Sequence, residues 1–201
     1  MAKIKYTKNE LKSQRDSLRR YTRYLPTLQL KKQQLQIEIR NIEHQMDSKN
    51  AEIDKFKQQL EAWISLFATQ PDLTQYLRLD SVLSRDENIA GVDIPVIDEI
   101  AFKKTTPDLY ATPAWLDDGI KALEMTTRLQ LELRYLQVAH LLLREELRIT
   151  AQRVNLFEKV KIPEAQENIR VIRIFLGDEQ TAGVARAKIA KSKTLRLLEA
   201  V

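Results

Sequence analysis

The sequence has 201 residues, of which 43% are hydrophobic and 30% are charged, and its formal net charge is +5. It contains no cysteine, which excludes disulfides, thiolate metal sites and a cysteine nucleophile. Only 4 glycines and 6 prolines interrupt it, a composition typical of a few long helices. No uncharged run approaches the ~20 residues of a membrane-spanning helix, and the amino terminus lacks the apolar block of a signal peptide. We therefore expect a soluble chain.

The charge is unevenly distributed along the chain. Residues 1–40 contain eleven Lys and Arg against three acids, and residues 183–201 contain five against one. Residues 72–118 contain four basic residues against ten acids. If the two ends of the chain lie together, the molecule has a basic end and an acidic end. Such a charge distribution influences which partners the chain binds, and it does not determine the fold.

Residues 1–70 are predicted to form one long helix. Thr7 and Glu10 have the spacing of a capping box. Apolar residues then follow a heptad pattern, and 14 of its 17 positions are apolar, which predicts a seam against a second helix. Pro26 predicts a kink in this helix. The seam positions are Leu11, Gln14, Leu18, Tyr21, Leu25, Leu28, Lys32, Leu35, Ile39, Ile42, Met46, Lys49, Ile53, Phe56, Leu60, Trp63 and Phe67.

Two lysines, Lys32 and Lys49, interrupt this apolar seam. In the simpler interpretation their aliphatic stems pack on the seam while the ammonium groups reach water. In the second interpretation they control register, since a polar seam residue penalises misaligned pairings.

Residues 71–114 are predicted to form a compact acidic insert. Gln70, Pro71 and Asp72 are expected to end the first helix, and three further prolines lie within the insert. Residues 92–96 alternate as in a strand. Residues 100–102 or 109–111 would pair with that strand as a small hairpin, whereas Val82 and Leu83 are expected in a short helix or turn.

Residues 115–201 are predicted to form the second long helix, with Pro113 before it and Asp117 and Asp118 in its opening turn. Its apolar stripe slips by one residue, because Phe157 and Ala165 are eight residues apart rather than seven. Pro163 lies at this slip, so we expect a bend there. The stripe comprises Leu129, Leu133, Leu136, His140, Leu143, Leu147, Thr150, Val154, Phe157, Ala165, Ile169, Ile172 and Leu176.

Together these elements predict a mainly α fold, in which the N- and C-terminal segments form a long antiparallel two-helix coiled coil with the small insert at one end. This arrangement would place residues 1–40 near residues 165–201, so that both basic segments share one end.

The residue types that carry catalysis are not arranged for it. His44 and His140 are the only histidines, and neither has a second metal ligand at helical spacing. The four glycines form no phosphate-binding loop. The adjacent pair Glu145 and Glu146 and the pair Asp117 and Asp118 point in different directions on a helix, so they suit solvated charge rather than acid–base chemistry. We expect no catalysis, no cofactor and no metal site.

Three function classes remain compatible with the charge pattern. A basic two-helix end would bind nucleic acid, although only Tyr6, Tyr21 and Tyr24 interleave with its basic residues. It would also bind anionic lipid, although its charges surround the helix rather than occupy one face. The third class is a mechanical or scaffolding subunit whose ends are held by different proteins.

Three stretches resemble a known family. Arg153, Val154, Asn155 and Glu158, followed by Ile162-Pro163 and then Ile169 and Ile172, resemble the C-terminal helix of the D subunit of V-type and archaeal-type rotary ATPases. Residues 88–95 resemble the strand that follows the first helix of that family. Thr7-Lys8 with Leu11, and the basic helix from Leu28 to Leu35, resemble its N-terminal helix. The order and spacing of these stretches cover most of the chain.

The resemblance implies a non-catalytic central rotor shaft, which transmits rotation between an ATP-hydrolysing or ATP-synthesising ring and a membrane ion-translocating ring. In that family the basic end stands inside a ring of alternating catalytic A and non-catalytic B subunits. The other end, with the F subunit alongside, sits on the funnel-shaped subunit that caps the membrane ring. The implied location is cytoplasmic and peripheral to the membrane. The side chains expected to meet the ring are Lys8, Lys12, Arg15, Arg19, Lys188 and Lys191.

Overall fold

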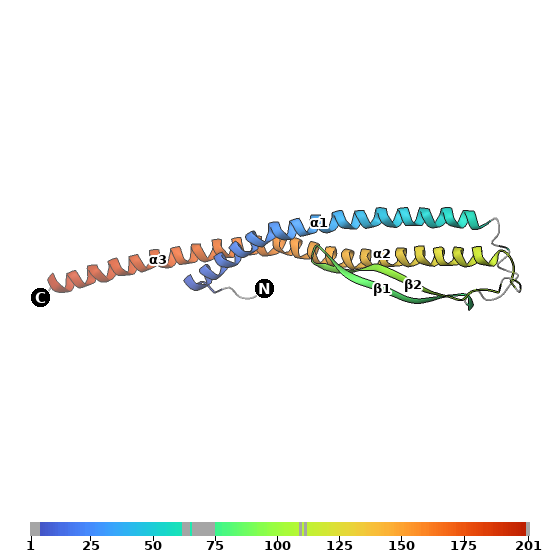
Figure 1. Cartoon of the computed structure of the whole chain (residues 1–201). Helices are drawn as coiled ribbons and strands as arrows, with labels where there is room; N and C mark the ends of the chain where they lie inside the picture. Colours follow the sequence, from blue (N-terminus) through green and yellow to red (C-terminus); the bar gives the residue numbers. More distant parts are fainter. Residues whose placement is uncertain (1–4, 62–64, 66–74, 109, 111, 200–201) are drawn as a thin grey trace. The chain divides into compact units, whose positions relative to one another are not determined.

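The fold is mainly helical, with one antiparallel β-hairpin between the helical segments (Figure 1). The computed structural model describes residues 5–61, 65, 75–108, 110 and 112–199. In chain order the elements are α1 (Lys8–Glu61), β1 (Leu77–Ile89), β2 (Val92–Lys104), α2 (Leu116–Leu156), the π-helical turn η3 (Phe157–Lys161) and α3 (Ile162–Glu199). The expected fold class is therefore confirmed.

The chain divides into two units, and each contains a part of both helical segments. Unit 1 comprises residues 1–30 and 150–201, and unit 2 comprises residues 31–149. The division expected from the sequence, 1–70, 71–114 and 115–201, differs from these units because it groups residues by their order along the chain. That division stays a prediction. The expected first-helix end at residues 70–72 and the seam positions Trp63 and Phe67 lie outside the described residues.

Helix α1 begins where the capping box predicts. The backbone N–H of Glu10 donates to Thr7 Oγ1 at 3.2 Å, which satisfies one of the free donors of the first turn. The Glu10 carboxylate accepts a bond from Gln14 Nε2 at 2.8 Å. Helix α1 runs without a break through Pro26, and the kink expected there stays a prediction.

The seam prediction for α1 is confirmed over its described length, since every seam position from Leu11 to Leu60 is buried or half-buried. In unit 2 the core joins α1, α2 and β2. It consists of Leu35, Ile39 and Ile42 from α1, Ala139 and Leu143 from α2, and Ile94 from β2. Full burial of one such leucine or isoleucine side chain stabilises the fold by about 1.5–3 kcal/mol.

Two ion pairs and a histidine–carboxylate contact in unit 2 join α1 and α2 in an antiparallel order. Lys31 Nζ lies 2.6 Å from Glu146 Oε1, and Lys49 Nζ lies 2.8 Å from Glu132 Oε2. His140 Nε2 lies 3.1 Å from Glu43 Oε1. The hydrogen bond to Glu132, with a second to Glu52, raises the pKa of Lys49 above its usual value of 10.5. Lys49 is thus held by a carboxylate of the opposite helix, and the choice between the two interpretations of the seam lysines stays a prediction.

The β-hairpin turns at Ala90 and Gly91, whose φ angles are +52° and +79°. Two consecutive positive φ angles are typical of the two-residue type I′ turn, which matches the twist of the flanking strands. Asn88 Oδ1 accepts a hydrogen bond from the Gly91 N–H at 3.1 Å and stabilises this turn. The strand expected at residues 92–96 is confirmed as the start of β2.

The partner of that strand was predicted wrongly. Residues 100–102 continue β2 instead of forming a second strand, and the pairing strand is β1, from Leu77↔Lys104 to Ile89↔Val92. Val82 and Leu83 therefore lie in a strand rather than in a short helix or turn. Leu109 and Ala111 are outside the described residues. The pairing shifts register twice, between Leu79 and Ser81 and between Leu83 and Ser84.

Helix α2 begins at Leu116, with Asp117 and Asp118 in its first turn as expected. The predicted C-terminal stripe is also confirmed, since each of its positions from Leu129 to Leu176 is buried or half-buried. In unit 1 this stripe faces the start of α1 in antiparallel order. The rings of Tyr6 and Phe175 stack with centroids 4.9 Å apart, and Asn168 Nδ2 donates to Gln14 Oε1 at 3.4 Å.

The one-residue slip of the stripe coincides with a π-helical turn. Within η3 the N–H of Ile162 donates to the carbonyl oxygen of Phe157, five residues back instead of four. Such a turn accommodates one extra residue, so Phe157 and Ala165 remain on the same face although eight residues separate them. The slip at this place was predicted, but its form is a π turn just before Pro163.

Helix α3 continues beyond the part of α1 that it faces. Tyr6 lies against Phe175. All residues from 177 to 196 are exposed, except Gly183, which is half-buried. In unit 1, contacts of Tyr6, Gln14 and Tyr21 therefore reach residues 157–175 of the second helical segment. The expectation that both basic segments lie side by side is not met for residues 183–196.

Candidate partner-binding surface

Basic side chains of α1 lie together along one groove of unit 1. Lys8, Lys12, Arg15 and Arg19 follow steps of four, three and four residues, which places them on one face of a helix. All four are exposed, and with Leu11 and Asp16 they line a groove of about 390 Å³. The structure thus brings together the four α1 residues that the sequence selects.

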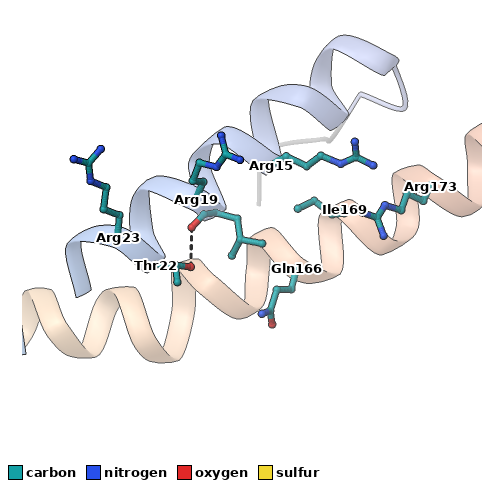
Figure 2. Close-up of a pocket in the computed structure, with 8 residues that line it drawn as sticks. Arg15, Arg19, Thr22, Arg23, Gln166, Ile169 and Arg173 are labelled. Carbon is teal, nitrogen blue, oxygen red and sulfur yellow. Dashed lines mark hydrogen bonds between the residues drawn. The ribbon is translucent and has the colours of Figure 1, made fainter. Parts of the chain in front are cut away.

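A second groove lies between α1 and α3 and is richer in arginine. It has a volume of about 660 Å³ and an apolar floor that includes Leu18 and Ile169. Its charged lining consists of Arg15, Arg19, Arg23 and Arg173, and Thr22 and Gln166 complete it. In Figure 2 the side chains of Arg15 and Arg173 come from different helices and point toward one another beside Ile169.

The described lining of this second groove includes no carboxylate. Among the described residues, no ion pair includes Arg15, Arg19, Arg23 or Arg173. A guanidinium presents a planar fork of donors that fits a carboxylate or a phosphate with two parallel hydrogen bonds. The groove is therefore a surface for an anionic group, with apolar contact available beneath it.

Arg23 and Arg173 were not selected from the sequence. The spacing of Arg23 could have identified it, since it follows Arg15 and Arg19 at steps of four residues and so lies on the same face of the helix. Arg173 lies four residues after the stripe position Ile169, and an antiparallel pairing places it opposite the start of α1. Both assignments need the pairing register of α1 and α3, which the single sequence does not supply.

The two remaining residues of the expected set, Lys188 and Lys191, lie in the exposed part of α3. They line neither groove. The structure therefore separates the expected contact residues into a cluster on α1 and a pair on the extension of α3.

The adjacent glutamates and His140 contact neighbouring side chains and form no catalytic arrangement among the described residues. Glu146 pairs with Lys31, whereas Glu145 pairs with Arg148 at 2.6 Å, so the two adjacent carboxylates do point in different directions. The hydrogen bond from Arg148 lowers the pKa of Glu145. His44 is exposed, and His140 is half-buried against Glu43.

Two kinds of site are absent from the described residues. No group of three or more His, Cys, Asp or Glu side chains is arranged to hold a metal ion in that part of the chain. Of the helices described, none has a stretch that is both long and apolar enough to cross a membrane.

Comparison with known proteins gives one consistent result. Residues 10–192 match the family model of the ATP synthase D subunit. The V-type ATP synthase D subunit of Borreliella burgdorferi is 49% identical over 196 residues, which cover 98% of this chain and 97% of the relative. The proteins of the same name from Chlamydia trachomatis and Chlamydia pneumoniae are 33% and 32% identical, over 96% and 94% of this chain and 96% and 92% of theirs. The chain therefore belongs to the family of V-type ATP synthase D subunits.

Proposed function

We propose that this chain is the non-catalytic central-stalk subunit of a V-type ATP synthase, and that it transmits rotation between the ATP-hydrolysing or ATP-synthesising ring and the membrane ion-translocating ring. The observation that carries the proposal is the family match, which extends over residues 10–192 and includes relatives aligned over nearly their whole length. The partners in this role are the A and B subunits of the ring, the F subunit and the funnel-shaped subunit on the membrane ring.

The packing within each unit supports a role in transmitting torque. A single helix bends and twists easily, whereas two helices that share a packed seam resist both. In unit 2 this seam is reinforced by the pairs Lys31–Glu146 and Lys49–Glu132, which oppose sliding of α1 against α2. In unit 1 the stacked rings of Tyr6 and Phe175 and the contact of Tyr21 with Phe157 join α1 to the second helical segment.

The arginine groove of unit 1 supports contact with acidic loops of the ring. Exposed pairs of arginine and carboxylate contribute about 0–1 kcal/mol each and are weakened by salt. Several such contacts together hold the shaft in place, and each of them breaks easily. A shaft that turns inside a ring needs this combination, because its contacts must be released at every step.

The chain's own residues carry no part of the ATP chemistry in this proposal. The A–B ring supplies catalysis, and this chain couples its conformational cycle to rotation. The chain lies in the cytoplasm and reaches the membrane only through the complex. The described helices, none of which is suited to span a bilayer, are compatible with such a peripheral position.

Binding to an A–B ring tests the proposed contact. We expect the double variant Arg19→Glu/Arg23→Glu to bind the ring about 10-fold more weakly at low salt, because two exposed attractions become repulsions. The matched control is Arg20→Glu/Arg153→Glu, which makes the same charge change at exposed positions outside both grooves. Equal ring affinity of the two variants would contradict the assignment of this surface.

A further inference from the structure

Unit 2 contains a groove of about 700 Å³ between the β-hairpin and the helices α1 and α2. Its floor is apolar and includes Ile42, Ile94, Val96, Ile100 and Leu136. This size is within the range of grooves that receive side chains or small ligands. Its lining includes residues from the acidic insert, residues 71–114, and none of the four arginines that line the second groove of unit 1.

The rim of this groove is negatively charged. Five carboxylates line it, against the two cations Lys49 and Arg128. Lys49 is held by Glu132 at 2.8 Å, and Arg128 lies 3.8 Å from Glu124. Two of the lining carboxylates, Glu87 and Glu99, are exposed and belong to no ion pair in the described part of the chain. The groove is therefore suited to a segment that combines apolar and basic side chains.

The chain itself carries a segment of that kind. Residues 184–196 of α3 contain five Lys and Arg and no acid. Val184, Lys188, Lys191 and Leu195 follow steps of four, three and four residues, so they form one stripe with apolar ends and a basic centre. The side chains of Val184 and Leu195 are 58% and 50% exposed. Because isolated helices of this length are marginal in water, a covering surface would stabilise this part of α3.

The dimensions of the stripe and the groove agree. From Val184 to Leu195 the helix rises by roughly 16 Å at 1.5 Å per residue. The part of β2 from Ile94 to Ile100 that lines the groove extends over roughly 20 Å at about 3.3 Å per residue. The stripe is therefore short enough to lie along the part of the groove that β2 lines.

We propose that, in the free chain, the stripe of Val184, Lys188, Lys191 and Leu195 docks in the acidic groove of a second copy. The contact is heterologous, since the stripe of one copy meets a different surface on the next. Heterologous contacts generate closed rings when the rotation between copies closes and open filaments when it does not, so the size of the assembly follows from that rotation. The proposal concerns the free chain and does not depend on the proposed function; if that function holds, capture of the α3 extension by the ring ends the self-association.

Sedimentation velocity of the purified full chain tests the proposal. At about 0.02 M NaCl we expect the mean mass to rise steadily with protein concentration, and at about 0.5 M NaCl we expect a monomer, because salt screens exposed charges. The variant Lys188→Glu/Lys191→Glu is expected to remain monomeric at low salt. A wild-type chain that remains monomeric at about 200 µM and low salt, a concentration that populates even contacts of micromolar affinity, overturns the proposal.

A charge exchange separates this contact from general electrostatic attraction. The variant Glu87→Lys/Glu99→Lys should also be monomeric, and an equimolar mixture of the two double variants should associate again, because each stripe then meets a groove of opposite charge. The control Arg186→Glu/Lys193→Glu makes the same charge change on the opposite side of the same helical segment and should associate like the wild type. Loss of association in this control, or no association in the mixture, would contradict the assigned surfaces.

Discussion

The ring of Tyr21 lies against the ring of Phe157, the first residue of the π-helical turn, with the centroids 5.2 Å apart. The contact lies in unit 1 at the point where the second helical segment takes up its extra residue. The stripe remains in register with α1 on the far side of this turn, because Ala165, Ile169 and Ile172 are buried.

Removal of the extra residue should therefore be tolerated, whereas a second extra residue should not. Deletion of the exposed residue Glu158 restores a seven-residue spacing between Phe157 and Ala165 and should convert η3 to regular α-helix. We expect the thermal midpoint to change by no more than about 5 °C. Insertion of one alanine after Glu158 would rotate the following stripe by about 100° and should lower the midpoint by well over about 10 °C.

The control for this pair is an alanine inserted after Thr181, where the described residues of α1 do not cover α3. Circular dichroism melts of the three variants and the wild type give the comparison. If the insertions after Glu158 and after Thr181 have equal effects, the π turn does not set the register of the stripe.

The buried seam of unit 2 should dominate stability. Leu35 and Leu143 are fully buried, so Leu35→Ala or Leu143→Ala should lower the free energy of unfolding by about 2–5 kcal/mol, through lost burial and the cavity left behind. Leu141 is 66% exposed, and Leu141→Ala should cost less than about 0.5 kcal/mol. Urea unfolding followed by circular dichroism measures both, and similar costs at Leu141 and Leu143 would contradict the described packing.

The ion pair of Lys49 predicts a loss of stability at high pH. The hydrogen bond to Glu132 raises the pKa of Lys49 above 10.5 in the folded chain. A raised lysine pKa stabilises the folded state fully below the unfolded value, and this stabilisation is lost as pH rises through the folded value. Lys49→Met should therefore lose less stability than the wild type as the pH rises from 10.5, the unfolded value, through the folded value.

Lys57 provides the matched control for this measurement, because it is exposed and its partner Asp54 lies on the same helix. Lys57→Met should show the wild-type pH dependence in urea unfolding. If the free energy of unfolding of Lys49→Met depended on pH in the same way as that of Lys57→Met, the ion pair of Lys49 would not stabilise the seam.

Deletion of residues 184–201 tests the role of the α3 extension in the proposed complex. We expect the truncated chain to keep its thermal midpoint within a few degrees, since the described side chains after Leu176 are almost all exposed. Its dissociation from an A–B ring at moderate salt should become faster, because Lys188 and Lys191 are lost. Surface plasmon resonance with an immobilised ring gives both rate constants, and an unchanged dissociation rate would refute this role.

Most of the helical architecture could be predicted because it depends on periodicity. The heptad positions of α1 and the stripe from Leu129 to Leu176 identify buried faces without knowledge of the partner helix. The same pattern also located the slip between Phe157 and Ala165. Its form as a π turn could not be read from the spacing, because a proline bend and a π turn both follow a one-residue change of register.

Strand β1 was missed for a physical reason. Of its 13 residues only Leu77 is buried, and Val82 and Ile89 are half-buried, so burial of its side chains does little to specify this strand. Its conformation depends on pairing with β2, which is a non-local contact. Arg173 was missed for the same reason, since it joins Arg15 and Arg19 only through the packing of α3 on α1.

Rotation of this chain within an assembled ring tests the central claim most directly. The chain has no cysteine, so Ser84→Cys, at an exposed position of β1, gives a unique site for a bead or gold particle. With the A–B ring fixed to a surface and the F subunit present, addition of ATP should produce unidirectional rotation of the label, and the isolated chain should hydrolyse no ATP. A label that stays still while the assembled ring hydrolyses ATP would contradict the account.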